Sequence, residues 1–139
     1  MAANILVMDG QGGQLGSQIV KELLLKYPDI RITAVGTNAM ATAAMMKAGA
    51  AKGATGENPV IVACRTADVI IGPIGIVIAD SLLGEVTPAM AAAVGQADAV
   101  RILIPMNKCG NLVAGVSSLS TTALIQDAVA KAGACLKSG

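Results

Sequence analysis

The chain contains no histidine, tryptophan or phenylalanine, and its only aromatic side chain is that of Tyr27. Without histidine it lacks the usual general base, the Ser–His and Cys–His pairs of nucleophilic catalysis, and a common zinc ligand. Without several aromatic rings it lacks a platform for stacking nucleic-acid bases, and its ten basic residues form no stripe. We therefore expect no nucleic-acid partner.

Long apolar runs are also missing. The longest, residues 69–79, is interrupted by two glycines and a proline, and it is far shorter than the roughly 20 residues of a membrane span. The first residues lack the basic and apolar regions of a signal peptide. We expect no membrane partner and a cytoplasmic location. An odd number of widely spaced cysteines also fits a reducing compartment better than a disulfide framework: Cys64, Cys109 and Cys135.

The composition that remains is typical of a globular protein. Of the 139 residues 54% are hydrophobic and 14% are charged, with a net charge of +1, which excludes a disordered chain. The length predicts one domain, residues 1–139. So high an apolar content in a small body leaves apolar surface uncovered, and we expect a homo-oligomer, specifically a dimer.

Short apolar runs alternate with segments of helical periodicity along the whole chain. Strands are expected at residues 4–9, 31–35, 52–56, 69–72 and 100–105, with a sixth at 112–116. A first helix is expected from the glycine loop to about Tyr27, and a second from a cap at Thr37 or Asn38 to Gly49. Further helices are expected at residues 58–67, 89–96 and 120–132, with a strand as the alternative for 60–67. This alternation predicts an α/β, Rossmann-like, doubly wound fold, with a mainly parallel sheet of five or six strands in an α/β/α three-layer arrangement. Ligands of such folds bind at the carboxyl ends of the strands.

A glycine-rich turn connects the first strand to the first helix. Its glycines at 10, 13 and 16 have the spacing G-x-x-G-x-x-G. The first allows a tight turn, the second or its neighbour lets a phosphate approach the backbone, and the third lets the helix pack closely. The free amides and dipole of the helix then attract an anion. A turn that binds nothing is the alternative. The predicted phosphate site consists of Gly10, Gln11, Gly12, Gly13, Gln14, Leu15 and Gly16.

The rest of a nucleotide is expected to extend along the same sheet edge. Candidate contacts are Thr37 and Asn38 after the second strand, and Gly72, Pro73 and Ile74 after the fourth. An NAD site usually has an acid after the second strand, and no arginine is present there to favour NADP. The identity of the cofactor therefore stays open, and NAD(P) or another nucleotide is the expectation. A helix cap is the alternative role of Thr37 or Asn38.

Two familiar nucleotide motifs are incomplete in this chain. Residues 4–16 resemble the start of the extended and atypical short-chain dehydrogenase/reductases, whose chemistry uses a Tyr-x-x-x-Lys pair. Here Tyr27 is followed four residues later by Arg31, so that mechanism is not expected. An ATP or GTP P-loop requires a lysine after its last glycine, and Gly16 is followed by Ser17.

Over nearly its whole length the chain resembles a family of short bacterial proteins catalogued only as a domain of unknown function. This resemblance implies a Rossmann-like fold and supplies no activity. It is carried by Asp9-Gly-Gln-Gly-Gly, Ala34-Val-Gly-Thr-Asn38, Ala54-Thr-Gly-Glu-Asn58, Ile71-Gly-Pro-Ile-Gly75, Ala79-Asp-Ser-Leu-Leu-Gly-Glu85 and Arg101-Ile-Leu-Ile-Pro105.

Two further places carry side chains capable of chemistry. Asp80, Ser81 and Glu85 follow the fourth strand, where the acids either contact a substrate or ribose or serve as helix-end and interface charges. Lys108 precedes Cys109 and favours its thiolate; a plain surface loop is the alternative. With no histidine and no Cys-x-x-Cys, we expect no metal site within one chain.

These observations give three hypotheses of different classes. The first is a nucleotide- or dinucleotide-binding protein that acts as a sensor, an accessory subunit, or an enzyme completed between subunits. The second is a structural or assembly module that keeps the fold and binds no ligand. The third is a thiol-based redox protein that uses Cys109.

Overall fold

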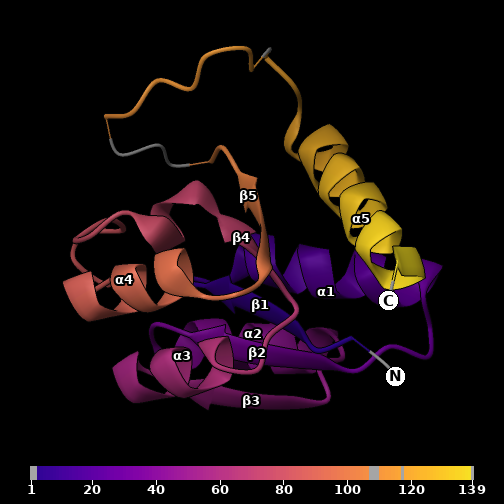
Figure 1. Cartoon of the computed structure of the whole chain (residues 1–139), viewed down its shortest axis with the longest axis horizontal. Coiled ribbons are helices and arrows are strands. Elements are labelled where there is room, and N and C mark those ends of the chain that lie inside the picture. Colours follow the sequence, from indigo (N-terminus) through magenta and orange to yellow (C-terminus); the bar gives the residue numbers. More distant parts are fainter. Residues whose placement is uncertain (1–2, 107–109, 117, 139) are drawn as a thin grey trace.

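The computed structural model describes residues 3–106, 110–116 and 118–138. Its sheet has five strands, all parallel to their neighbours, in the order β3-β2-β1-β4-β5 (Figure 1). This is the strand order of the Rossmann fold, so the predicted fold class is confirmed. The strands are β1 (Ile5–Asp9), β2 (Ile32–Gly36), β3 (Lys52–Thr55), β4 (Val69–Pro73) and β5 (Val100–Ile104).

Helices cover both faces of this sheet and complete the three layers. Side chains of the central strands alternate between two cores, so that Ile5 and Val7 of β1 enter one while Leu6 and Met8 enter the other. The first core is covered by α1 (Gln14–Lys26), α2 (Ala39–Ala48) and α5 (Thr121–Ser138). The second is covered by α3 (Glu57–Cys64), α4 (Pro88–Gln96) and the short 3₁₀ helix η1 (Ile74–Val77).

Most helix boundaries follow local capping signals. The side chain of Asn38 accepts a hydrogen bond from Ala41 N and starts α2, and Thr87 caps α4 in front of Pro88. The start of α3 differs from the prediction, because the chain turns at Gly56 (φ 108°) and the helix begins at Glu57. Asn58 is therefore the second helical residue and not the cap.

The helix expected at 58–67 forms as α3 and ends at Cys64, so the alternative strand at 60–67 does not form. Two other predictions were wrong. Residues 112–116 form no strand, because Leu112 is 95% exposed and Gly115 turns the chain at φ 81°. The last helix extends to Ser138, six residues beyond its predicted end at 132, since Cys135 and Leu136 continue its packing against the core.

The segment between η1 and α4, residues 78–87, lies on the carboxyl edge of the sheet and is called the β4–α4 loop below. Three of its non-glycine residues have left-handed backbone angles: Asp80, Leu82 and Leu83. The Ser81 hydroxyl donates a hydrogen bond to Gly75 O, and Asp80 N donates one to Val86 O. These bonds hold the loop in a compact turn above β1 and β2. In the described part of the chain, no helix is long and apolar enough to cross a membrane.

Candidate functional site

The carboxylate of Asp9, at the end of β1, holds the glycine turn (residues 10–16) from inside. Its two oxygens accept hydrogen bonds from Gly10 N at 2.8 Å and Gly16 N at 2.7 Å. Burial raises the pKa of this carboxyl; the two amide bonds oppose the rise, and the charge of Glu85 adds to it. Asp9 therefore fixes the turn, and two of its amides are no longer free for a ligand.

The glycines of the turn have different surroundings. Gly13 has φ 75°, and a Cβ there would lie 2.7 Å from Ala41 Cα of α2. A Cβ on Gly16 would lie 2.7 Å from Met45 Sδ, also on α2. Both glycines thus permit α1 to pack against α2. Gly12 has no atom within 4 Å of its Cβ position, so of these three it is the one whose Cα faces open space.

Glu85 closes the opposite side of the turn. Its Oε1 accepts hydrogen bonds from Gln11 N at 2.8 Å, Thr37 Oγ1 at 2.6 Å and Asn38 Nδ2 at 2.8 Å. Burial acts to raise the pKa of Glu85, but the hydrogen bonds from Thr37, Gln11 and Asn38 outweigh it and lower that pKa below its ordinary value. The carboxylate is therefore ionised at neutral pH. Glu85 thus places a carboxylate beside Thr37 and Asn38, at the end of β2, where the chain has no acid of its own.

The β4–α4 loop covers the β2 side of the turn. A Cβ on Gly10 would lie 2.6 Å from Thr37 Oγ1 and 2.9 Å from Leu82 Cδ1. Among the residues predicted to bind the rest of a nucleotide, Thr37 and Asn38 are held by Glu85, and Asn38 also caps α2. Gly72 and Pro73 are buried, as their strand is throughout. None of the residues at 37–38 and 72–74 is among those that line the open part of the turn.

The open part is a pocket of about 560 Å³, called the turn pocket below. The backbone amides of Gly12, Gln14 and Leu15 donate no hydrogen bond to any residue that the structure describes. The pocket also has a second wall, formed by the first turn of α5 and by Met106, two residues after the end of β5. It is lined by Asp9, Gly10, Gln11, Gly12, Gly13, Gln14, Leu15, Gln18, Leu82, Met106, Thr121 and Thr122.

Sequence reasoning did not identify the α5 side of this pocket. Ser120 Oγ accepts a hydrogen bond from Ala123 N at 3.1 Å, so Thr121 and Thr122 are the first residues of α5. The N-termini of α1 and α5 therefore both line the pocket, and their dipoles make it favourable for a negative charge. The sequence feature that could have indicated this wall is the run of hydroxyl residues 120–122, which is typical of a helix start.

The other candidate residues have structural roles or lie outside the described residues. Cys64 is buried, and burial raises the pKa of its thiol; Cys135 packs against the first core. Tyr27 packs against Gly133 of α5. Lys108 and Cys109 lie outside the described residues. Among the residues that are described, no group of three or more acids and cysteines is placed to hold a metal ion.

Comparisons with known proteins identify a family and leave the activity open. A sequence profile of the domain of unknown function DUF3842 matches residues 4–137. A solved structure, the dodecameric FMN-dependent UbiX-like decarboxylase from Escherichia coli O157:H7, is 14% identical over 91% of this chain and 90% of that one, with a TM-score of 0.40. So weak a likeness supports no inference about binding. No curated protein matches the chain. Neither match is to a short-chain dehydrogenase/reductase, so that resemblance stays a prediction.

Proposed function

The chain belongs to the DUF3842 family, and we propose that it binds a small phosphate-bearing molecule, a nucleotide, in the turn pocket. The phosphate would lie on the amides of Gly12, Gln14 and Leu15, which have no partner among the described residues. In this proposal the protein is a cytosolic homo-oligomer, and it acts as a sensor, an accessory subunit, or an enzyme completed between subunits.

The observation that carries the proposal is that backbone amides without a partner among the described residues border an open pocket. Gly12 leaves room for an anion, since no atom lies within 4 Å of its Cβ position. Unpaired amides at a helix N-terminus and the helix dipole together favour phosphate. Thr121 and Thr122 supply hydroxyl groups on the opposite wall, at the start of a second helix. A phosphate with an attached sugar matches this combination of donors.

The shape of the site favours a mononucleotide over a dinucleotide. The pocket volume of about 560 Å³ lies within the range of small-molecule sites, about 300–1,000 Å³. A dinucleotide in this fold extends from the turn to the end of β2, and that direction is closed by Leu82 and Glu85. The sugar and base would instead lie toward Met106 and the start of α5.

Calorimetric titration tests the proposal with AMP, ADP, ATP, GTP, FMN, NAD, NADP, FAD and coenzyme A as probes. The test variant is Gly12→Glu, which places bulk and a negative charge in the pocket at a position with free space. Gly95→Glu on α4 is the matched control, because its Cβ position is equally open. We expect at least one mononucleotide to bind, with roughly tenfold or greater loss in Gly12→Glu only. Absence of binding by every probe would overturn the proposal.

A second candidate function is a structural or assembly module that binds no ligand. It is favoured by the carboxylates of Asp9 and Glu85, which already accept hydrogen bonds from Gly10, Gly16 and Gln11. In that case the turn is an internally satisfied connection between strand and helix. The same titrations separate the two functions, since a module of this kind gives no heat with any nucleotide.

A further inference from the structure

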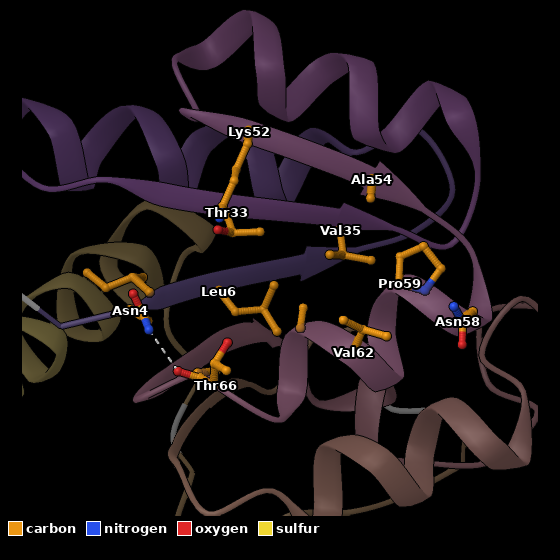
Figure 2. A pocket seen from close by; sticks show the side chains of 13 residues that line it. Asn4, Leu6, Thr33, Val35, Lys52, Ala54, Asn58, Pro59, Val62 and Thr66 are labelled. Atoms are coloured by element: carbon orange, nitrogen blue, oxygen red, sulfur yellow. Dashed lines mark hydrogen bonds between the residues drawn. The ribbon is translucent and has the colours of Figure 1, made fainter.

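A second pocket, of about 460 Å³, lies on the other side of the sheet between α3 and strands β1, β2 and β3 (Figure 2). We call it the α3 pocket. Its walls share no residue with the turn pocket. Leu6, Val35 and Val62 contribute side chains to its apolar body (Figure 2).

The pocket exists because α3 uses only one of its sides for packing. Val60 and Cys64 are buried in the second core, against α4 and the sheet. Residues 58, 59, 62 and 63 lie on another side of the helix and line the pocket, as does Thr66 just after the helix ends. Val62 is 45% exposed, and all four residues of β3 are exposed. The sheet surface of β2 and β3 is therefore only partly covered.

The register of the sheet places Thr33 and Lys52 toward one end of the pocket, while Asn58 and Pro59 lie at the other end (Figure 2). One row across the strands consists of Leu6, Thr33 and Lys52, and the next row places Val35 beside Ala54. Asn4 and Thr66 lie at the same end as Thr33, joined by a hydrogen bond of 3.0 Å (Figure 2). Pro59 lies at the opposite end, near Ala54 (Figure 2).

The end at Thr33 carries one basic side chain, that of Lys52, and Asp68 lies next to it, where its Oδ2 accepts a hydrogen bond from Asn4 N at 2.7 Å. The lining residues contain Lys52 and no acid, and the one ion pair that the described residues form joins Lys131 to Asp127. The Lys52 side chain runs from β3 toward Thr33 on β2 (Figure 2). No described residue forms a hydrogen bond with the Thr33 hydroxyl or the Lys52 ammonium. An anion at this end would meet a cation and hydroxyl donors.

We propose that the α3 pocket binds an amphipathic carboxylate, a molecule with an unbranched or ring-shaped apolar body and one acidic head. The body would lie on Leu6, Val35 and Val62, and the head would contact Lys52 and Thr33. Pockets of this volume with mostly apolar walls and a few polar groups are typical of small-molecule sites. The charge at one end selects the acid over a neutral or cationic head.

The same observations disfavour a second copy of the chain as the occupant. Pairing through the edge of β3 would be limited to four residues, one of them a lysine. Short edge strands that carry lysine are a common means of preventing edge-to-edge association. A small ligand needs no such pairing and can lie between α3 and the sheet.

Sodium decanoate is the test probe, with 1-decanol and decyltrimethylammonium as head-group controls, measured by calorimetry on the full chain. We expect decanoate to bind more tightly than either control. Lys52→Gln should weaken decanoate binding about two- to fivefold and leave decanol binding unchanged. Ala54→Leu, which fills the end of the pocket near Pro59 at an exposed position, should weaken both ligands about tenfold. Lys21→Gln, an exposed lysine on α1, should change neither.

Three results would overturn this proposal. One is no binding of decanoate, and another is equal binding in wild type, Lys52→Gln and Ala54→Leu. The third is a loss of oligomer mass in Val62→Asp by sedimentation, which would make a second copy the occupant. Each of these outcomes is independent of nucleotide binding in the turn pocket, since the two pockets share no residue.

Discussion

Oε1 of Glu85 lies 2.8 Å from the backbone nitrogen of Gln11, and these residues are 74 positions apart in the chain. The contact joins the β4–α4 loop to the glycine turn. Since the same oxygen also binds Thr37 and Asn38, one carboxylate fixes the ends of β1 and β2 relative to each other. It leaves the other side of the turn open, and that asymmetry defines the turn pocket.

Glu85→Gln tests this contact. The folded-state pKa of Glu85 is below its ordinary value of 4.5, so its ionised form stabilises the fold above that pH, and the contribution is lost as pH falls through the folded pKa. We expect the variant to lose about 1 kcal/mol of unfolding free energy at pH 7, with a smaller loss below pH 4.5. Urea denaturation at pH 7 and at a pH below 4.5 measures the unfolding free energy of both proteins. Equal losses at the two pH values would contradict it, and Glu22→Gln on α1 is the control.

Asp9 has the opposite linkage, because burial raises its pKa above the ordinary value of 3.8. Its ionised form is penalised in the folded state, so stability relative to Asp9→Asn should fall as pH rises from 3.8 through the folded pKa. Asp9→Ala removes the acceptor of two amides and should cost about 2–4 kcal/mol at neutral pH. Asp9→Asn, which keeps one acceptor oxygen, should cost less. Chemical denaturation across this pH range measures these losses. Equal unfolding free energies for Asp9→Ala and Asp9→Asn would contradict the proposed role of the Asp9 oxygens.

Gly13→Ala and Gly12→Ala should differ sharply in stability. Gly13 combines φ 75° with a close approach to Ala41, so alanine there should destabilise the protein by about 2–4 kcal/mol. Gly12 has open space at its Cβ position, and alanine there should cost less than about 0.5 kcal/mol. Thermal unfolding compares the two variants. A large loss in Gly12→Ala would mean that this position is packed and closed to a ligand.

Much of the fold followed from local signals in the sequence. Four apolar runs and the short exposed segment Lys52–Thr55 became five parallel strands, and Asn38 and Thr87 began helices as capping residues should. The strand predicted at 112–116 was wrong because an apolar run alone does not show that a tertiary partner covers it; Leu112 is almost fully exposed. The start of α3 was missed because a glycine at φ 108° replaced the expected side-chain cap.

The candidate site could be predicted only in part. The glycine turn is continuous in sequence, so its position between β1 and α1 was evident. The contacts that limit it come from elsewhere in the chain: Glu85 from the β4–α4 loop, and Thr121 and Thr122 from α5. Without the fold, no local pattern shows that these segments meet at one edge of the sheet. The sequence therefore located the turn and left the direction of its open side undetermined.

The most direct test of the account is a ¹H–¹⁵N NMR titration of the protein with ADP and, separately, with inorganic phosphate. Binding in the turn pocket predicts that the largest shifts fall on the amides of Gly12, Gln14 and Leu15, with smaller shifts at Thr121 and Thr122. These shifts should disappear in Gly12→Glu and persist in Gly95→Glu. If the amides of the turn stay unchanged at saturating ADP and phosphate, the turn pocket is not an anion site.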